Sequence, residues 1–239
     1  MKKLFVAALV MLLSAGALSA QNNFRGIVKY KIESTGKVAF TIPAEQSQME
    51  IKVYDNKVSD GTKTQTDYKV VQAIDFSPYI SYLAANDIEL ESYTGDGKFL
   101  IRGEVTKEEL DSLYIEDKEP GHFYYEMVDE TQNILGFTAK KLIMHSYDEE
   151  GVDSPQVCWY TTEIGPEYNL VLGSMKGFPL VISQNLGDGK AITLTATEIV
   201  KGKVKEVEML PPAGYKEATE EEFETFQKEM KDAFELLED

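Results

Sequence analysis

The chain has 239 residues, of which 24 are basic and 41 acidic, so its formal net charge is −17 at pH 7. Phosphate backbones and anionic membrane surfaces repel so acidic a protein, which argues against nucleic-acid binding and against electrostatic docking to a membrane. Cys158 is the only cysteine, so an internal disulfide is excluded and the fold must depend on its hydrophobic core.

Residues 1–20 have the pattern of a secretory signal peptide. Lys2 and Lys3 precede the apolar run 4–13, and small residues follow up to Ala20. The run is too short to cross a bilayer, which takes about twenty apolar residues. Cleavage near Ala20 would remove two lysines and change the net charge from −17 to −19. No cysteine follows the small residues, so we expect an exported protein, periplasmic or secreted, without a lipid anchor.

Alternation of apolar and polar residues predicts a strand-rich chain after the signal peptide. In segment 24–33, Val28, Tyr30 and Ile32 fall on one face and charged residues on the other. The same period of two recurs in segments that begin near residues 49, 98, 123 and 192. One apolar and one polar face are typical of antiparallel sheets, and we expect about ten strands.

Two Asp-Gly pairs predict hairpin turns, because these residues accept the positive φ values that tight turns require. The expected hairpins are 88–94 with 98–105 across Asp96-Gly97, and 178–184 with 191–200 across Asp188-Gly189.

Three segments are expected to be helical. Ser77 is a predicted N-cap followed by Pro78, which starts a helix up to residue 85. Thr106 and Thr219 each stand three residues before a glutamate, the arrangement of a capping box, and start a short helix and the C-terminal helix. The C-terminal helix carries one apolar stripe, formed by Phe223, Phe226, Met230, Phe234 and Leu237.

The sequence contains no recognisable catalytic or metal-binding motif. The two histidines, His122 and His145, are far apart and lie in no nucleophile or zinc pattern. Residues 148–153 lack the residue order of an EF-hand and are interpreted as a solvated acidic loop. Cys158 lies in a strand-like run, which predicts a buried, unreactive thiol. We therefore expect no enzyme activity, no metal and no cofactor.

Aromatic residues point to a binding role instead. The aromatic-rich segment around Tyr79 either packs against the sheet or forms a lid over an apolar cavity. The C-terminal helix is likewise either part of the core or a plug in the concave face of a curved sheet. The residues expected to line an apolar ligand cavity are Tyr79, Tyr82, Leu83, Trp159 and Phe178.

Four stretches resemble, in order, sequence blocks of exported Gram-negative families of unknown function. The stretches are 134–141 (Ile-Leu-Gly-Phe-Thr-Ala-Lys-Lys), 158–164 (Cys-Trp-Tyr-Thr-Thr-Glu-Ile), 177–180 (Gly-Phe-Pro-Leu) and 212–216 (Pro-Ala-Gly-Tyr-Lys). One such family is the GLPGLI family, and a related group ends its strands in Pro-x-Gly-Tyr-Lys. The related group fits better, because residues 176–181 read Lys-Gly-Phe-Pro-Leu-Val. The resemblance covers mainly residues 131–217. It implies a fold like that of periplasmic lipoprotein carriers, with a curved antiparallel half-barrel around helices, and it transfers no catalytic residue.

The sequence as a whole predicts a signal peptide at 1–20 and a single mainly β (α+β) domain at 21–239. The domain is a curved antiparallel half-barrel of about ten strands, with a mid-chain helix and a C-terminal helix covering its concave face. The leading hypothesis is a non-enzymatic envelope protein that binds a lipophilic or apolar, lipid-like ligand in the concavity. Two alternatives stay open: an envelope scaffold with a filled core and a protein partner, or a hydrolase without a recognisable motif.

Overall fold

The computed structural model describes residues 24–36, 47–90, 93, 95–114, 123–148, 151–186 and 189–236. The predicted signal peptide and His122 lie outside these ranges. Within them, no helix combines the length and the apolar character needed to span a bilayer.

Strands dominate both halves of the described chain. The elements before residue 115 are β1 (Arg25–Thr35), β2 (Gln48–Tyr54), β3 (Lys57–Ser59), β4 (Lys63–Thr66), β5 (Lys69–Asp75), α2 (Ser77–Ala85), β6 (Lys98–Glu104) and α3 (Lys107–Ser112). The later strands are β7 (Phe123–Ile134), β8 (Phe137–Ser146), β9 (Gln156–Thr161), β10 (Tyr168–Asn169), β11 (Met175–Lys176), β12 (Phe178–Asn185) and β13 (Ala191–Lys201). The chain continues through η3 (Glu206–Met209), β14 (Lys216–Glu217) and α4 (Glu220–Glu235).

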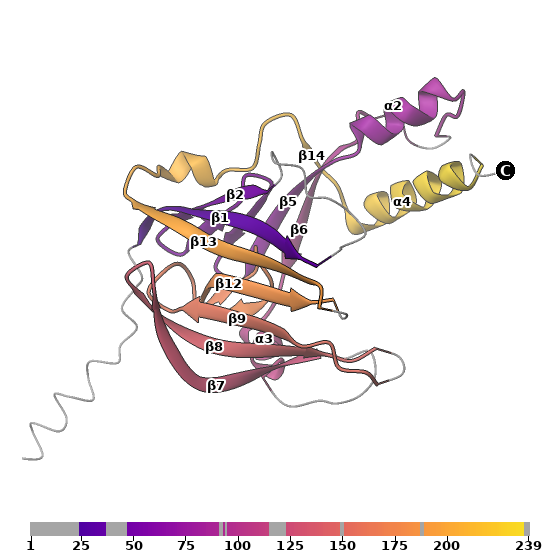
Figure 1. Ribbon diagram of the computed structural model, residues 1–239. Helices are drawn as coiled ribbons and strands as arrows, with labels where there is room; N and C mark the ends of the chain where they lie inside the picture. Colours follow the sequence, from indigo (N-terminus) through magenta and orange to yellow (C-terminus); the bar gives the residue numbers. More distant parts are fainter. Residues whose placement is uncertain are drawn as a thin grey trace, which may run out of the picture.

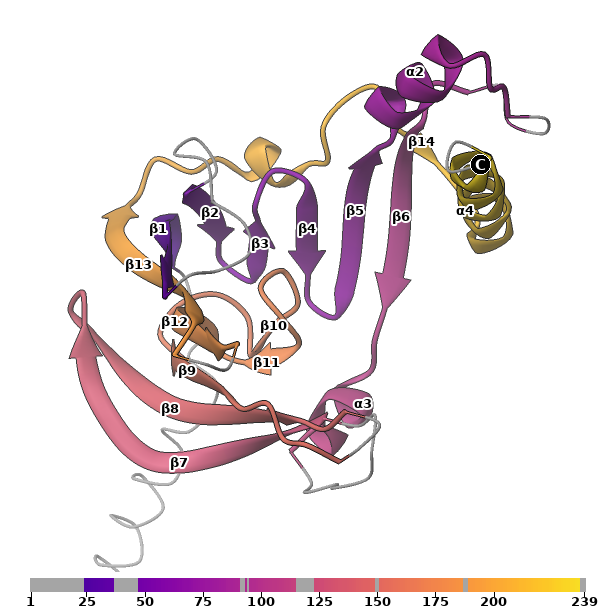
Figure 2. The same ribbon diagram turned by 45° about the vertical axis from the view of Figure 1, so that its right-hand side comes forward.

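Twelve of the described strands form one sheet, in the order β14-β6-β5-β4-β3-β2-β1-β13-β12-β9-β8-β7 (Figure 1). All neighbouring strands are antiparallel except β14 and β6. The sheet is open and strongly curved, so that β6 and β7 stand on opposite sides of its hollow (Figure 2). The predicted fold class is confirmed. The sheet has more strands than the expected ten because β3, β4 and β14 are too short to show a period of two.

The first strand shows how the alternating pattern builds the core. Val28 and Tyr30 are buried on the inner face of β1, and Val28 lies opposite the buried Ile51 of β2. Tyr30 also donates a hydrogen bond from its hydroxyl to the carbonyl oxygen of Pro179, at 2.5 Å. A buried phenol needs such an acceptor, and this bond ties β1 to β12 across the core.

The concave face is occupied by the segment between β9 and β12. This segment, residues 162–177, contains the short β10–β11 ladder and lies inside the curve of the sheet (Figure 2). The fully buried side chain of Gln65 fastens it: its Nε2 donates to the carbonyl oxygen of Tyr168 at 2.6 Å, and its Oε1 accepts from the backbone nitrogen of Leu170 at 2.7 Å. The short helix α3 adds Leu110 to the same cluster.

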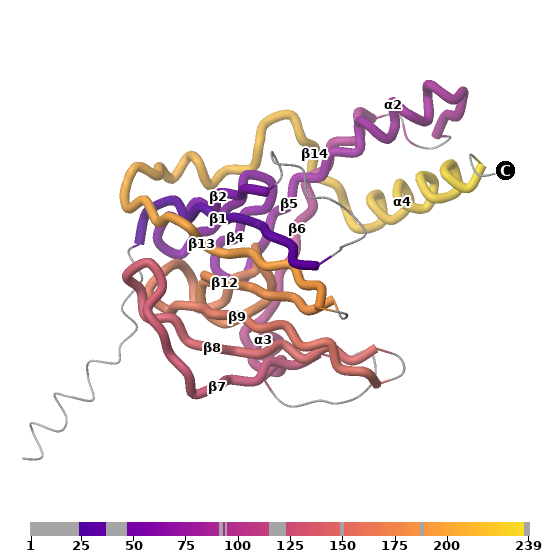
Figure 3. The backbone as a smooth tube through the Cα atoms, viewed as in Figure 1, coloured from indigo at the N-terminus to yellow at the C-terminus, as the bar shows by residue number. Residues whose placement is uncertain are grey.

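The helices α2 and α4 lie beyond the ends of β5 and β6, which is not the place that the sequence led us to expect (Figures 1 and 3). They form a hydrophobic cluster of their own around Leu83, Phe99, Phe226, Met230 and Ala233. The reason is local. Phe76 directly follows β5 and Phe99 lies at the start of β6, so the apolar surface that needs covering is at this end of the sheet. Among the predicted helices, α3 is the one on the concave side.

One predicted hairpin is wrong and the other is confirmed. The antiparallel partner of β6 is β5, and α2 lies between them in the sequence. Residues 88–90 form no strand. Gly97 has the φ of +77° expected of a turn glycine, but a Cβ there would stand 2.6 Å from the Cδ1 of Ile80, because the turn packs against α2. The pairing of β12 with β13 is as predicted.

The predicted helix starts need one correction. The capping boxes at Thr106 and Thr219 are both present. Helix α2 spans the expected residues, but its N-cap is Phe76 and not Ser77. The carboxylate of Asp75 accepts a hydrogen bond from the backbone nitrogen of Ser77 at 2.9 Å. An acidic residue that precedes the helix therefore satisfies one of the backbone N–H groups in its first turn.

Candidate functional site

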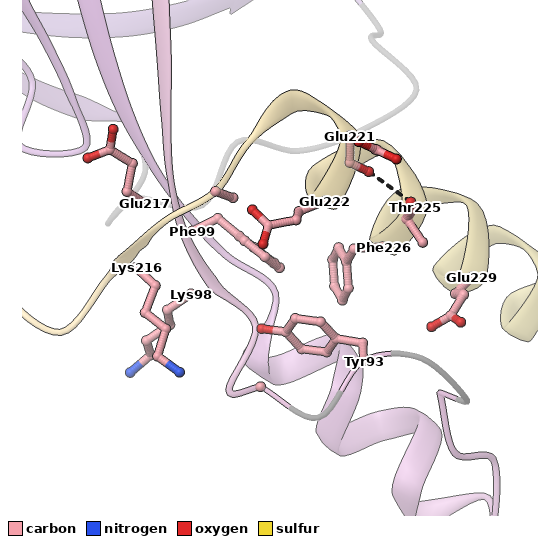
Figure 4. A pocket seen from close by; sticks show the side chains of 12 residues that line it. Tyr93, Lys98, Phe99, Lys216, Glu217, Glu221, Glu222, Thr225, Phe226 and Glu229 are labelled. Atoms are coloured by element: carbon pink, nitrogen blue, oxygen red, sulfur yellow. Dashed lines mark hydrogen bonds between the residues drawn. The ribbon is translucent and has the colours of Figure 1, made fainter.

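A pocket of about 490 Å³ opens where α4 meets the β6–β14 end of the sheet (Figure 4). Its lining residues come from the loop before β6, the start of β6, the strand β14 and the first half of α4. They are Tyr93, Gly95, Lys98, Phe99, Lys216, Glu217, Ala218, Glu221, Glu222, Thr225, Phe226 and Glu229. The parallel pairing of β14 with β6 is what brings residues 216–218 beside residues 98–100.

Three aromatic rings form the apolar part of the pocket. The ring centroids of Phe99 and Phe226 are 4.7 Å apart, and that of Tyr93 lies 4.6 Å from Phe226 and 5.4 Å from Phe99. All three pairs are tilted, an arrangement that aromatic quadrupoles favour. Tyr93 is held in place because its hydroxyl accepts a hydrogen bond from the backbone nitrogen of Gly97 at 2.8 Å. A Cβ on Gly95 would stand 2.3 Å from that hydroxyl, so the loop needs glycine at this position to admit the ring.

Charged side chains surround the rings and fall into two groups (Figure 4). Lys98 and Lys216 line one end, and the glutamates of α4 line the other side. Glu217 is paired with Arg102 at 2.8 Å, and this hydrogen-bonded ion pair lowers the pKa of Glu217. Glu222 accepts from the backbone nitrogen of Thr219 at 2.8 Å, which lowers its pKa as well. These two carboxylates are therefore ionised and already engaged.

A second hollow, of about 300 Å³, lies on the concave side between β5, β6 and the segment 162–177. Tyr68, Val70 and Leu170 line it together with the more polar residues of β6. It borders the cluster that holds α3, so most of the concave face is filled by the chain itself.

The five residues predicted to line one cavity do not come together. Leu83 is buried in the α2–α4 cluster, while Tyr79 and Tyr82 are 53% and 55% exposed and contact Phe234 of α4. Phe178 is fully buried in the sheet core, against which Trp159 packs. Sequence reasoning missed the residues of the aromatic pocket. Their signals were present separately, in the stripe on the C-terminal helix and in the strand pattern at residue 99.

His145 offers no free nitrogen for chemistry. Its Nδ1 lies 2.6 Å from a carboxylate oxygen of Asp153 and its Nε2 3.0 Å from one of Glu126. With both ring nitrogens engaged by carboxylates, the ring can neither activate a nucleophile nor bind a metal without losing a partner. Among the described residues, no group of three acidic, histidine or cysteine side chains could hold a metal ion.

The single cysteine is buried, as predicted. Cys158 is 2% exposed, and its Sγ lies 3.3 Å from the Sδ of Met175 in a hydrophobic cluster. Burial raises the pKa of the thiol well above its usual value, which keeps it protonated and unreactive.

The fold and the pocket together define a β-rich protein with a curved open sheet, a filled concave face and an aromatic pocket at one end. No protein-family model matches the chain, and no curated protein matches it. The resemblance to the GLPGLI-related group therefore stays a prediction.

Among solved structures, the chain is similar to PNGF-II in space group C2, at 15% identity and a TM-score of 0.50. The match covers 88% of this chain and 33% of PNGF-II, so the chain spans about a third of that protein, and at this identity the likeness is one of fold alone. The chain also matches the Mycobacterium tuberculosis lipoprotein LppX, at 13% identity, 82% and 95% coverage and a TM-score of 0.30. A LolA superfamily protein from Nitrosomonas europaea matches at 9% identity, 79% and 90% coverage and a TM-score of 0.25. The two lower TM-scores fall below the level at which a common fold follows.

Proposed function

We propose that the protein is an exported, non-enzymatic binding protein for an apolar or lipophilic small molecule, which occupies the pocket between β6, β14 and α4. The observation that carries the proposal is a cavity of about 490 Å³ with a cluster of three aromatic rings and six charged side chains in its lining. Small-molecule sites are concave, roughly 300–1,000 Å³ in volume, and combine apolar walls with a few polar groups.

The binding energy would come mainly from removing the ligand's own apolar surface from water, because Phe99 and Phe226 are already only 5% and 1% exposed. Such burial contributes roughly 25 cal/mol per Å², before the costs of association are subtracted. The site differs from the concavity that the sequence suggested, because residues 162–177 fill most of the inner face with their own side chains.

Export rests on the sequence of residues 1–20, whose charged start, apolar run and small residues are those of a signal peptide. The net negative charge favours solubility in any compartment. It therefore does not indicate whether the protein is exported.

A fluorescence titration with the uncharged probe N-phenyl-1-naphthylamine tests the proposal. We expect saturable binding to residues 21–239 that Thr225→Trp abolishes, because Thr225 lines the pocket and an indole there would occupy it. Lys228→Trp places the same ring on an exposed part of α4 outside the pocket and should leave binding unchanged. Absence of probe binding, or equal losses in both variants, would refute the proposed site. If the titration supports the site, extraction and mass spectrometry of natively purified protein would identify the natural ligand.

A protein-interaction role is the second candidate, and two exposed tyrosines of α2 favour it. Tyr79 and Tyr82 are both more than half exposed, and Phe234 of α4 lies 6.2 and 6.3 Å from their ring centroids. Exposed tyrosines are common at protein interfaces. The double substitution Tyr79→Ser/Tyr82→Ser separates the two roles: a protein interface would lose its partner in cross-linking experiments, while probe uptake would continue.

A further inference from the structure

Two lysines, Lys98 and Lys216, line one end of the aromatic pocket. Lys98 begins β6 and Lys216 begins β14, and the parallel register aligns Lys216 with Phe99, one residue beyond Lys98. Both side chains line the pocket, and Figure 4 shows their amino groups directed to the same end of it. Two like charges in one pocket repel each other, and an anion between them would offset that repulsion.

Neither lysine has an ion-pair partner in the part of the chain that the structure describes. The nearby carboxylates have other partners. Glu217 is paired with Arg102 at 2.8 Å. Asp75, opposite Lys98 in β5, accepts from the backbone nitrogen of Ser77 at 2.9 Å; this contact with Ser77 lowers its pKa most, and the charge of Lys98 lowers it further. In a chain with 41 acidic and 24 basic residues, two lysines that line one pocket and form no salt bridge among the described residues differ from the surrounding negative charge.

The rest of the pocket determines how a ligand would lie. The α4 side carries Glu221, Glu222 and Glu229, which repel an anion from that end. The rings of Phe99 and Phe226 stand between the two charged groups, as Figure 4 shows. A molecule with one anionic head and one apolar body would therefore place the head at the lysines and the body over the rings.

We infer that the ligand is an anionic amphiphile, whose carboxylate or phosphate head is held by Lys98 and Lys216 and whose apolar body lies in the pocket beside Tyr93, Phe99 and Phe226. This inference rests on the proposed function, since it assigns a chemical class to the ligand of the same pocket. Lysine ammonium groups act as point charges with three donors each, so the pair suits a carboxylate and a phosphate monoester alike.

The test compares dodecyl ligands that share a tail and differ in the head. Isothermal titration below the critical micelle concentrations would measure dodecanoate, dodecyl phosphate, uncharged dodecanol and cationic dodecyltrimethylammonium, with inorganic phosphate as the head alone. We expect one or both anions to bind at least about tenfold more tightly than dodecanol, as charge-assisted hydrogen bonds would produce. Inorganic phosphate should bind much more weakly than dodecyl phosphate.

The matched variants are Lys98→Gln/Lys216→Gln and, as a control for net charge, Lys228→Gln on the exposed face of α4. The double variant should lose about tenfold in affinity for the preferred anion and keep its affinity for dodecanol, while the control keeps both. Equal binding of anions and dodecanol, tighter binding of the cation, or an unchanged double variant would overturn the inference and leave the apolar pocket standing. If no dodecyl compound binds at all, the proposed function itself fails.

Discussion

At the inner face of the sheet, the segment 162–177 fills the concavity with Ile164, Val171 and Tyr168, all of them buried. At the end of β6, the helices α2 and α4 cover the apolar surface, and a cavity of about 490 Å³ remains beside α4. The same requirement, burial of an apolar face, is met in two ways: a connecting segment packs into the curve of the sheet, and at the end of β6 two helices pack and leave a pocket. The sheet core and the proposed ligand pocket therefore lie in different parts of the molecule.

The largest expected effect is that of Phe178→Ala in the sheet core. Phe178 is fully buried, and truncation would remove its packing and leave a cavity. We expect a loss of about 3–5 kcal/mol in the free energy of unfolding, measured by urea denaturation. Val207→Ala, at a side chain that is 64% exposed, is the control and should change it by less than about 0.5 kcal/mol. A small effect at Phe178 would mean that the concave face is not a closed core.

The next effect tests the tight approach of residues 162–177 to β9. Gly177 has φ +73°, and a Cβ there would stand 2.7 Å from the carbonyl oxygen of Thr161. Gly177→Ala should lower the unfolding free energy by about 3 kcal/mol, from backbone strain and this contact together. Gly202 has nearly the same φ, +77°, with no atom within 4 Å of a Cβ. Gly202→Ala should therefore lose only the strain, about 1 kcal/mol. Equal losses in the same denaturation experiment would exclude a role for the close contact.

A smaller and more local effect is expected for Phe226→Ala in the α2–α4 cluster. Phe226 is 1% exposed and contacts Tyr93 and Phe99, but its cluster lies apart from the sheet core. We expect about 2 kcal/mol less protection against hydrogen exchange for the amides of α4, with the amides of β1 nearly unchanged. Equal loss of protection in α4 and β1 would show that the two regions unfold as one unit.

The smallest expected effect is a pH dependence at His145. Partial burial lowers its pKa, but the hydrogen bonds to Asp153 and Glu126 outweigh burial and raise the pKa above 6.5. A raised pKa in the folded state means that the stabilisation is complete below pH 6.5 and is lost as the pH rises through the folded value. We expect on the order of 1 kcal/mol or less, seen as a difference between wild type and His145→Gln that disappears at high pH. An NMR titration of His145 that gives an ordinary or lowered pKa would contradict this.

Much of the fold could be predicted from the sequence. The alternation around Val28 and Tyr30 and the capping boxes at Thr106 and Thr219 involve residues two or three positions apart, so local geometry alone determines them. The buried state of Cys158 followed from the strand around it.

The candidate site was not predictable in the same way. Its rings come from residues 93, 99 and 226, and its lysines from residues 98 and 216. These positions meet only because β14 adds to the free edge of β6, a two-residue pairing that leaves no period in the sequence. The wrong hairpin prediction across Asp96-Gly97 has a similar cause, because it too depends on a contact between distant residues. The strand that pairs with β6 is β5, which precedes α2 in the sequence and is not the segment directly before the turn.

The sequence by itself determined the strand-rich class, the helix starts, the single buried thiol and the acidic charge, because each depends on composition or on neighbours within one turn or pleat. Only the tertiary structure decided that residues 162–177 fill the concave face, that α2 and α4 lie at the end of the sheet, and that three rings and two lysines share a pocket. Those features depend on contacts between residues far apart in the chain, and the choice among such contacts is made by the packing of the whole core.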